Sequence, residues 1–110
     1  MSTPDRGDLV YVNFNPQAGH EQTGNRPGIV LSPKSFNEAT GFASVCPITN
    51  TVRGWGYEVK LPAGLSFQGV ILTDQVKNLD WHARNLRVRG QAPEEIVNDC
   101  LAKIHTFLSF

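Results

Sequence analysis

The stretch from Gly19 to Pro33 joins a polar first half to a short apolar run, and the two meet at an Asn-Arg-Pro step. The proline biases the residue before it, Arg26, toward an extended backbone. We therefore expect Arg26 to end a loop and to be anchored by a buried strand over Gly28 to Leu31. A guanidinium has five donors and a permanent charge, so one held in this way is suited to gripping a phosphate. A solvated arginine on a surface hairpin fits the same spacing.

Other residues along the chain can exchange a proton. His20 and Glu21 titrate near neutral and acidic pH, and Thr49 offers a hydroxyl at the end of a predicted strand. RNA carries its own nucleophile, the 2′-hydroxyl. A protein need only take that proton, stabilise the charged phosphorus centre and protonate the leaving 5′-oxygen, through general acid–base help and preorganised donors. As a set, these residues are compatible with RNA cleavage that needs no metal.

The sequence lacks the spacings typical of metal, nucleotide and serine-hydrolase sites. His20, His82 and His105 are scattered, without a His-Glu-x-x-His motif or paired cysteines. No P-loop, dinucleotide glycine fingerprint or Gly-x-Ser-x-Gly elbow is present. We therefore predict no metal and no cofactor. His105 lies beside the apolar face of the last predicted helix, and we expect it to be a packing residue.

Composition indicates one globular domain over residues 1–110, with 40% hydrophobic and 18% charged residues in 12.1 kDa. The formal net charge of +0 argues against a bulk binder of nucleic acid, but it leaves room for a local basic face. Four cations lie near a single acid late in the chain, and they form either a solvated edge or a patch for an anionic polymer. The cations are Lys77, Arg84, Arg87 and Arg89, and the acid is Asp80.

Neither a membrane segment nor a disulfide framework is expected. No apolar run approaches the ~20 residues of a membrane span, and residues 1–6 lack a signal-peptide core. The only two cysteines, Cys46 and Cys100, are far apart in the chain. We interpret them as reduced, buried thiols of a cytoplasmic protein, with a single bridge as the alternative.

Short strands separated by glycine and proline turns dominate the predicted elements, and a weak helical piece over Lys34 to Ala39 interrupts them. Pro47 cannot donate to a ladder, so we expect its end of the strand to be an edge or a bulge. The predicted strands are Leu9–Phe14, Gly28–Leu31, Phe42–Ile48, Tyr57–Leu61, Gly69–Thr73 with an extension over Val76–Leu79, and Leu86–Arg89.

The C-terminal segment is the clearest helix. Pro93 suits a first helical position, and Glu94 and Glu95 lie where the helix dipole favours acids. We predict a mainly β (α+β) fold, a small, partly open antiparallel barrel capped by this helix. The apolar stripe of the helix, with a period near 3.6, contains Ile96, Val97, Cys100, Leu101, Ile104, Phe107 and Leu108.

In this order, four segments resemble the MazF/PemK family of toxins from type II toxin–antitoxin modules: RGDLVYVNFNP, GHEQTGNRPGIVLSP, VCPIT and GVILTDQVKNLDW. The resemblance extends from Gly7 through the last helix. It implies an SH3-like barrel of the CcdB/PemK type, a homodimer and a metal-independent endoribonuclease. Such enzymes cut single-stranded mRNA at short motifs, leave 2′,3′-cyclic phosphate and 5′-hydroxyl ends, and so inhibit translation and growth.

The resemblance also implies roles for individual residues. The family's catalytic arginine falls on Arg26, its threonine on Thr49 and the glutamate of its Glu-Gln pair on Glu21. The Asp-Gln pair after a buried strand falls on Asp74 and Gln75, which are therefore predicted RNA contacts. An acidic antitoxin is the expected partner, largely disordered until it folds over the RNA groove.

One departure from the family pattern affects the mechanism. His20, before the Glu-Gln pair, matches the PemK-like branch, whereas Leu72 stands where that branch has an arginine and matches the MazF-like branch. Charge stabilisation then depends on Arg26, with Thr49 steadying the phosphate. His20 either shares in proton transfer or only contacts RNA or Glu21.

Base reading is expected to use unstacked nucleotides, which proteins recognise by stacking and by hydrogen bonds to base edges. Arg53 and Trp55 lie in a glycine-flanked loop after the predicted strand end, although Trp55 can equally pack over the barrel mouth. Gln22 joins them as a predicted RNA contact, with Lys77 and Arg84 as candidates for backbone phosphates.

Two other functions fit a fold of this kind. A CcdB-like toxin binds a topoisomerase without being an enzyme, but its activity depends on a C-terminal Trp-Gly-Ile, and this sequence ends in Leu108-Ser109-Phe110. A binding module that has lost activity is the other alternative, and no missing residue supports it.

Overall fold

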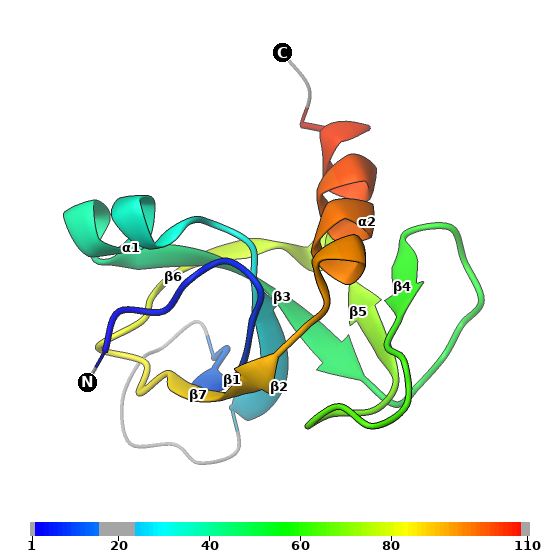
Figure 1. The fold of residues 1–110 in the computed structure, drawn as a ribbon, viewed down its shortest axis with the longest axis horizontal. Helices are drawn as coiled ribbons and strands as arrows, with labels where there is room; N and C mark the ends of the chain where they lie inside the picture. Colours follow the sequence, from blue (N-terminus) through cyan, green and yellow to red (C-terminus); the bar gives the residue numbers. More distant parts are fainter. Residues whose placement is uncertain (1, 16–23, 109–110) are drawn as a thin grey trace.

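The computed structural model describes residues 2–15 and 24–108 of the chain. His20, Glu21 and Gln22 lie outside the described residues, so the roles predicted for them stay predictions. The described part contains seven strands and two α-helices (Figure 1). The strands are β1 (Asp8–Asn13), β2 (Asn25–Val30), β3 (Phe42–Thr49), β4 (Glu58–Lys60), β5 (Val70–Leu72), β6 (Lys77–Asp80) and β7 (Arg87–Gln91); the helices are α1 (Lys34–Thr40), α2 (Glu94–His105) and the single 3₁₀ turn η1 (Thr73–Gln75).

All strand pairs are antiparallel, in the order β4-β5-β3-β2-β1-β7, with β6 paired to β3 outside this path. Strand β3 is therefore central, with β2 along one side and first β6, then β5, along the other. The described strands do not close into a complete ring, and α2 packs at one end (Figure 1). The predicted mainly β, partly open fold with a C-terminal helix is confirmed.

Strand β3 changes partner at Pro47. Its pairing with β6 ends at Val45, and its pairing with β5 starts at Ile48. Pro47 itself is paired with Gly28 of β2 on the other side. Pro47 thus lies between the pairing with β6 and the pairing with β5, so on this side of β3 no ladder hydrogen bond needs its missing N–H. The predicted interruption is real, but it affects only one side of the strand.

Two apolar cores lie on opposite sides of the β1–β2–β3 sheet, because neighbouring strand residues point to opposite faces. One core contains Leu9, Ile29 and Cys46 and is covered by α2. The other contains Val10, Val12 and Val45 and is closed by Leu79 of β6 and by Leu86. The residues that end the second core along β2 and β3 form the site described below.

Two strand predictions need correction. Strand β2 begins at Asn25 instead of Gly28, so Arg26 lies inside the strand, opposite Val12, and not at the end of a loop. The segment after Leu72 does not continue β5. It turns through η1 and forms the separate strand β6, which pairs with a different stretch of β3. A local run of branched residues cannot reveal such a change of partner.

The C-terminal helix also differs in detail. Pro93 is the N-cap residue and not the first helical residue, and the helix ends at His105. Phe107 and Leu108 are therefore 42% and 50% exposed and do not continue the buried stripe. The expectation of a packing role for His105 is wrong, because this residue is exposed in the last turn.

Cys46 and Cys100 are free and buried, as predicted. Burial raises the pKa of the Cys100 thiol to about 12, and the nearby Asp99 adds to the increase. Burial also raises the pKa of Cys46, with additional contributions from Cys100 and Asp74. Among the described residues, no helix is long and apolar enough to cross a membrane.

Candidate active site at the strand ends

A hollow of about 300 Å³ is lined by residues at the start of β2, at the ends of β3 and β5, and in the segments that follow these two strands. We call it the strand-end hollow. The described residues that line it include two arginines and no carboxylate, so its lining carries an uncompensated positive charge. They are Arg26, Thr49, Thr51, Arg53, Leu72 and Gln75.

The register of β2 and β3 brings the two main predicted catalytic residues together. Gly28 is paired with Pro47, and continuing this antiparallel register by two residues places Arg26 opposite Thr49. Both side chains extend from the face that carries Val30 and Val45 in the second core. Residues 23 positions apart in the sequence thus meet through strand pairing.

The guanidinium of Arg26 rests against an aromatic ring. Its central carbon lies 5.9 Å from the centroid of the Phe14 ring, within the range of a cation–π contact. Gly28 makes room for this ring, because a Cβ there would lie 3.0 Å from Phe14 and 2.9 Å from Val45. The contact holds the charge of Arg26 in place without neutralising it, which leaves its N–H donors for an anion.

The hydroxyl of Thr49 is oriented by its own backbone turn. Its oxygen accepts a hydrogen bond of 3.1 Å from the backbone N–H of Thr51. A hydroxyl that accepts in this way still has its hydrogen to donate. Thr49 can therefore donate to an oxyanion bound at Arg26.

The loop 50–57 separates the two RNA contacts predicted there. Arg53 lines the strand-end hollow. Trp55 is 49% exposed and packs edge-on against Tyr57, with ring centroids 5.6 Å apart, and it lines a neighbouring hollow with Glu58 and Gln68. Trp55 thus packs against Tyr57 of the same loop and still presents a face to solvent, and its contact with RNA stays a prediction.

Besides Trp55, three predicted RNA contacts among the described residues do not line the strand-end hollow. Asp74 is exposed on η1, although its neighbour Gln75 does line it. Lys77 is exposed on β6, three residues before Asp80, whose carboxylate accepts from the N–H of Ala83 at 3.0 Å. The guanidinium of Arg84 donates to the backbone carbonyls of Asn13 and Asn15, and this binds the turn before β7 to the end of β1.

The predicted basic face is dispersed. Lys77 lies on β6, whereas Arg87 and Arg89 are exposed on β7 at the edge of the sheet, and β6 and β7 do not pair. These cations match the solvated-edge alternative more closely than a single patch. Concentrated positive charge is found instead in the strand-end hollow.

Sequence reasoning missed two residues of this site, Phe14 and Thr51. Phe14 lies two residues after Val12, on the same face of the strand, which is the one available signal that it reaches Arg26. Thr51 gave no signal, because its role depends on the turn after β3. Leu72, noted as a departure from the PemK-like pattern, does line the hollow.

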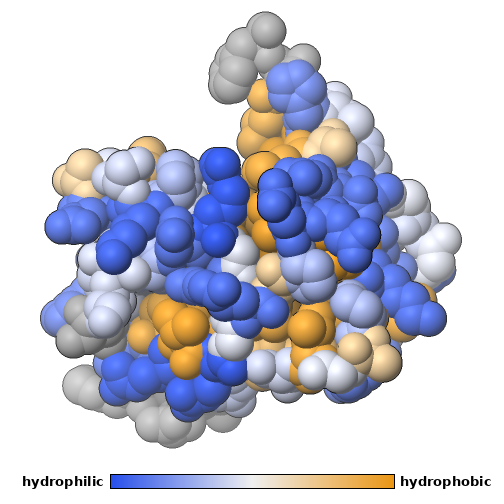
Figure 2. Space-filling model, in the orientation of Figure 1, coloured by the Kyte–Doolittle hydropathy of each residue, from blue (hydrophilic) through white to orange (hydrophobic). Residues whose placement is uncertain are grey.

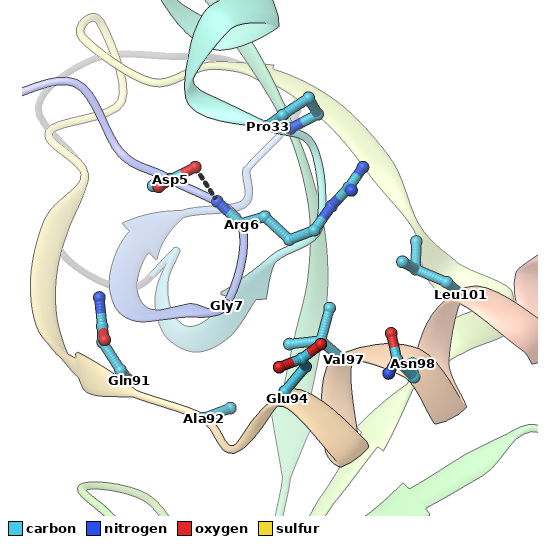
Figure 3. Close-up of a pocket in the computed structure, with 10 residues that line it drawn as sticks. All are labelled: Asp5, Arg6, Gly7, Pro33, Gln91, Ala92, Glu94, Val97, Asn98 and Leu101. Carbon is cyan, nitrogen blue, oxygen red and sulfur yellow. Dashed lines mark hydrogen bonds between the residues drawn. The ribbon is translucent and has the colours of Figure 1, made fainter.

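A larger hollow, of about 450 Å³, lies between the N-terminal segment and α2 (Figure 3). We call it the helix-side hollow. Its lining includes the opposite charges Arg6, Asp5 and Glu94, and Arg6 Nε donates to the carbonyl of Leu31 at 2.6 Å. None of the residues predicted to act on RNA lines it. In the part of the chain that the structure describes, no three His, Cys, Asp or Glu side chains cluster as metal ligands would.

Comparison with known proteins decides the family. Residues 5–108 match the model of the PemK-like, MazF-like toxins of type II toxin–antitoxin systems. The chain belongs to this family. It is 46% identical over 94 residues to the endoribonuclease toxin MazF of Escherichia coli K12, covering 84% of each protein. The predicted membership is thereby confirmed.

Solved structures of the PemK/MazF family share the whole fold. The crystal structure of MazF from Deinococcus radiodurans is 42% identical and superimposes with a TM-score of 0.90, covering 100% of both chains. A MazE–MazF complex from the same organism contains a chain that is 35% identical, with a TM-score of 0.87 and coverage of 100% and 99%. The barrel of this chain is therefore that of a PemK/MazF toxin.

Proposed function

We propose that this chain is the toxin of a type II toxin–antitoxin system and cleaves single-stranded RNA in the strand-end hollow without a metal ion. Its relatives are named endoribonucleases, and the family is one of toxins. The observation that carries the proposed site is the convergence of Arg26, Thr49 and Arg53 on one hollow whose described lining has no carboxylate.

The proposed reaction uses the nucleophile of the substrate. The 2′-oxygen attacks the adjacent phosphorus, its proton passes to a base, the P–O5′ bond breaks and a proton is delivered to the leaving 5′-oxygen. The products are a 2′,3′-cyclic phosphate and a 5′-hydroxyl. Arg26 stabilises the charge on the phosphoryl oxygens, since a guanidinium keeps its charge and is a poor proton donor. Thr49 donates to the same oxygens, and Glu21 or His20 supplies the base.

The substrate proposed is a single strand, with mRNA in the cytoplasm as the target. The reacting ribose and phosphate must enter the strand-end hollow beside Arg26 and Thr49, and a nucleotide that is not stacked on its neighbours can do so. Gln75 offers an amide for a base edge or phosphate at the same wall. Trp55, with an exposed face beside the loop, is suited to stacking on a neighbouring base.

A cognate antitoxin with an acidic segment is the proposed protein partner. A related toxin from D. radiodurans is found in a MazE–MazF complex. Two arginines without a described acid in the lining would attract carboxylates as well as phosphates. Such a segment covers the strand-end hollow and competes with RNA.

A homodimer is proposed through an apolar groove of about 350 Å³ between α1 and α2. Leu101 and Ile104 of α2, Leu108 just after this helix and Phe36 of α1 line it, and Phe36 and Leu108 are 38% and 50% exposed. Figure 2 shows apolar surface between the two helices, and in Figure 1 the end of α2 projects beyond the barrel.

The groove shares Arg6, Pro33 and Leu101 with the polar helix-side hollow. An apolar centre with a polar margin is typical of an interface, and a second copy of the chain is its proposed occupant.

Mapping of RNA ends tests the proposed function directly. Purified chain is incubated with a mixed pool of single-stranded RNA in excess EDTA, and both new ends are identified chemically. We expect cleavage at a short motif with cyclic phosphate and 5′-hydroxyl ends. A requirement for divalent cations, or fragments that carry 5′-phosphates, would contradict the mechanism. Incubation with gyrase and plasmid separates this function from that of a CcdB-like toxin.

A further inference from the structure

One carboxylate holds the segment that carries Arg53. The two oxygens of Glu58 accept the backbone N–H groups of Arg53 and Gly54, at 3.0 and 2.9 Å. The N–H of Glu58 in turn donates to the carbonyl of Trp55 at 3.1 Å. The turn 53–58 is therefore closed by the Glu58 side chain, which accepts two charge-assisted hydrogen bonds from backbone N–H groups.

Glu58 also lies close to the strand-end hollow. In the β4–β5 register it is directly opposite Leu72, and Leu72 lines the hollow. Side chains of directly opposite residues lie on the same face of a sheet, with Cβ atoms about 5 Å apart. A negative charge at the rim of a phosphate site is unfavourable for RNA binding unless it serves another purpose, and its hydrogen bonds to the loop indicate that purpose.

A second anchor fixes the other end of the same loop. Lys103 of α2 donates from Nζ to the carbonyl of Gly56 at 2.6 Å. Tyr57 packs edge-on against Phe107, with ring centroids 5.7 Å apart. The loop that bears Arg53 is therefore held at three places. The Thr49–Thr51 hydrogen bond holds its start, Glu58 holds its middle, and Lys103 holds its end.

We propose that Glu58 is a positioning residue that holds Arg53 at the strand-end hollow for contact with the RNA phosphate. This inference rests on the proposed function. Glu58 itself contacts no substrate; it acts through the backbone N–H groups of Arg53 and Gly54. Glycine at position 54 suits the turn, because its φ of 78° lies in the left-handed region.

The sign of the effect separates positioning from electrostatics. If Glu58 were only a charge near the RNA, Glu58→Ala would remove repulsion and raise kcat/KM, in a manner that salt suppresses. Positioning predicts the opposite: a fall of about tenfold, because a displaced contact loses much of its value in the transition state. Glu58→Gln keeps one acceptor oxygen and should recover part of the activity.

A double-mutant cycle with Arg53 is the decisive experiment. We expect Glu58→Ala to have almost no further effect on kcat/KM in an Arg53→Ala background, since the residue that it positions is gone. Glu38→Ala, which removes the same charge from exposed helix α1, serves as the matched control and should leave cleavage unchanged. An undiminished effect of Glu58→Ala in the double variant would overturn the proposal while leaving the endoribonuclease activity in place. If Glu58→Ala did not fold, Glu58→Gln would complete the same cycle.

Amide exchange tests the structural part without RNA. In the wild-type chain the N–H groups of Arg53 and Gly54 should exchange slowly in NMR spectra, and in Glu58→Ala they should exchange at the rate of an open loop. Slow exchange in that variant would contradict the proposed anchor. This readout is independent of cleavage, so a chain that failed to cut RNA would count against the proposed function and not against the anchor.

Discussion

The strand-end hollow and the helix-side hollow differ in size and, more importantly, in charge. The helix-side hollow is larger, about 450 Å³ against about 300 Å³, but its lining contains two acids, Asp5 and Glu94, beside its one cation, Arg6. The smaller hollow has Arg26 and Arg53 and no acid in its described lining. Size alone would select the wrong region. Positive charge without an acid in the same lining attracts anions, and it coincides with Arg26 and Thr49, two residues of the family motif.

The largest expected effect on RNA cleavage comes from replacing an arginine of the strand-end hollow, compared with replacing an arginine of the helix-side hollow. Arg26→Ala should lower kcat/KM for RNA by roughly 10²–10³-fold, because it removes a preorganised donor at the developing charge. Arg6→Ala, the matched change in the helix-side hollow, should leave kcat/KM within about threefold when both variants are compared as dimers. Equal losses from the two substitutions would remove the distinction between the hollows. Circular dichroism controls for folding of each variant.

A smaller effect is expected from the hydroxyl beside Arg26. Thr49→Val keeps the shape of the side chain but removes its donor, and kcat should fall by roughly tenfold or more. Thr49→Ser restores a hydroxyl and should restore most of the rate. If valine and serine behaved alike in single-turnover cleavage, the hydroxyl would have no part in the reaction, and the strand-end hollow would depend on its guanidinium groups alone.

Much of the fold and of the strand-end hollow could be predicted from the sequence, because local residue patterns indicate which segments form strands and helices. The branched and aromatic residues of Leu9–Phe14, the Arg-Pro step and the proline before α2 each indicated a strand or helix close to the observed one. Arg26 and Thr49 could be selected because they occupy the matching positions of a recognised family motif. Their register, Gly28 opposite Pro47, supplies the physical reason that they meet.

The remaining features depend on tertiary pairing. Nothing local to Val76 indicates that the chain leaves β5 through η1 and pairs with another part of β3. The role of Glu58 depends on a turn that brings two N–H groups to its carboxylate, and the alternation of Tyr57 to Leu61 predicts only a half-exposed strand. The exposure of His105 follows from where α2 ends, and helix ends are set by capping and by packing that a periodicity cannot show.

A third test concerns the face that adjoins the helix-side hollow. Leu108→Glu should weaken dimerisation at least tenfold, since it places a charge in the apolar α1–α2 groove. Val88→Glu on β7 is the matched control, because Val88 is also an exposed apolar residue, at 45% against 50% for Leu108. Sedimentation over a range of concentrations measures both. A dimer disrupted by Val88→Glu and not by Leu108→Glu would move the interface from the helices to the edge of the sheet.

The smallest expected effect lies in the core covered by α2, where Cys46 and Cys100 are buried. Burial raises the pKa of the Cys100 thiol from 9.0 to about 12. Near and above pH 9 the unfolded chain loses the thiol proton while the folded chain keeps it, so stability that is fully present below pH 9 falls as the pH rises toward 12. Between pH 7 and 10 the free energy of unfolding of the wild-type chain should therefore fall. In Cys100→Ala, which has no thiol at this position, the fall should be smaller by about 1 kcal/mol. Urea titrations at both pH values measure the difference, and identical pH slopes would mean that the thiol ionises as readily in the folded chain as in the unfolded one.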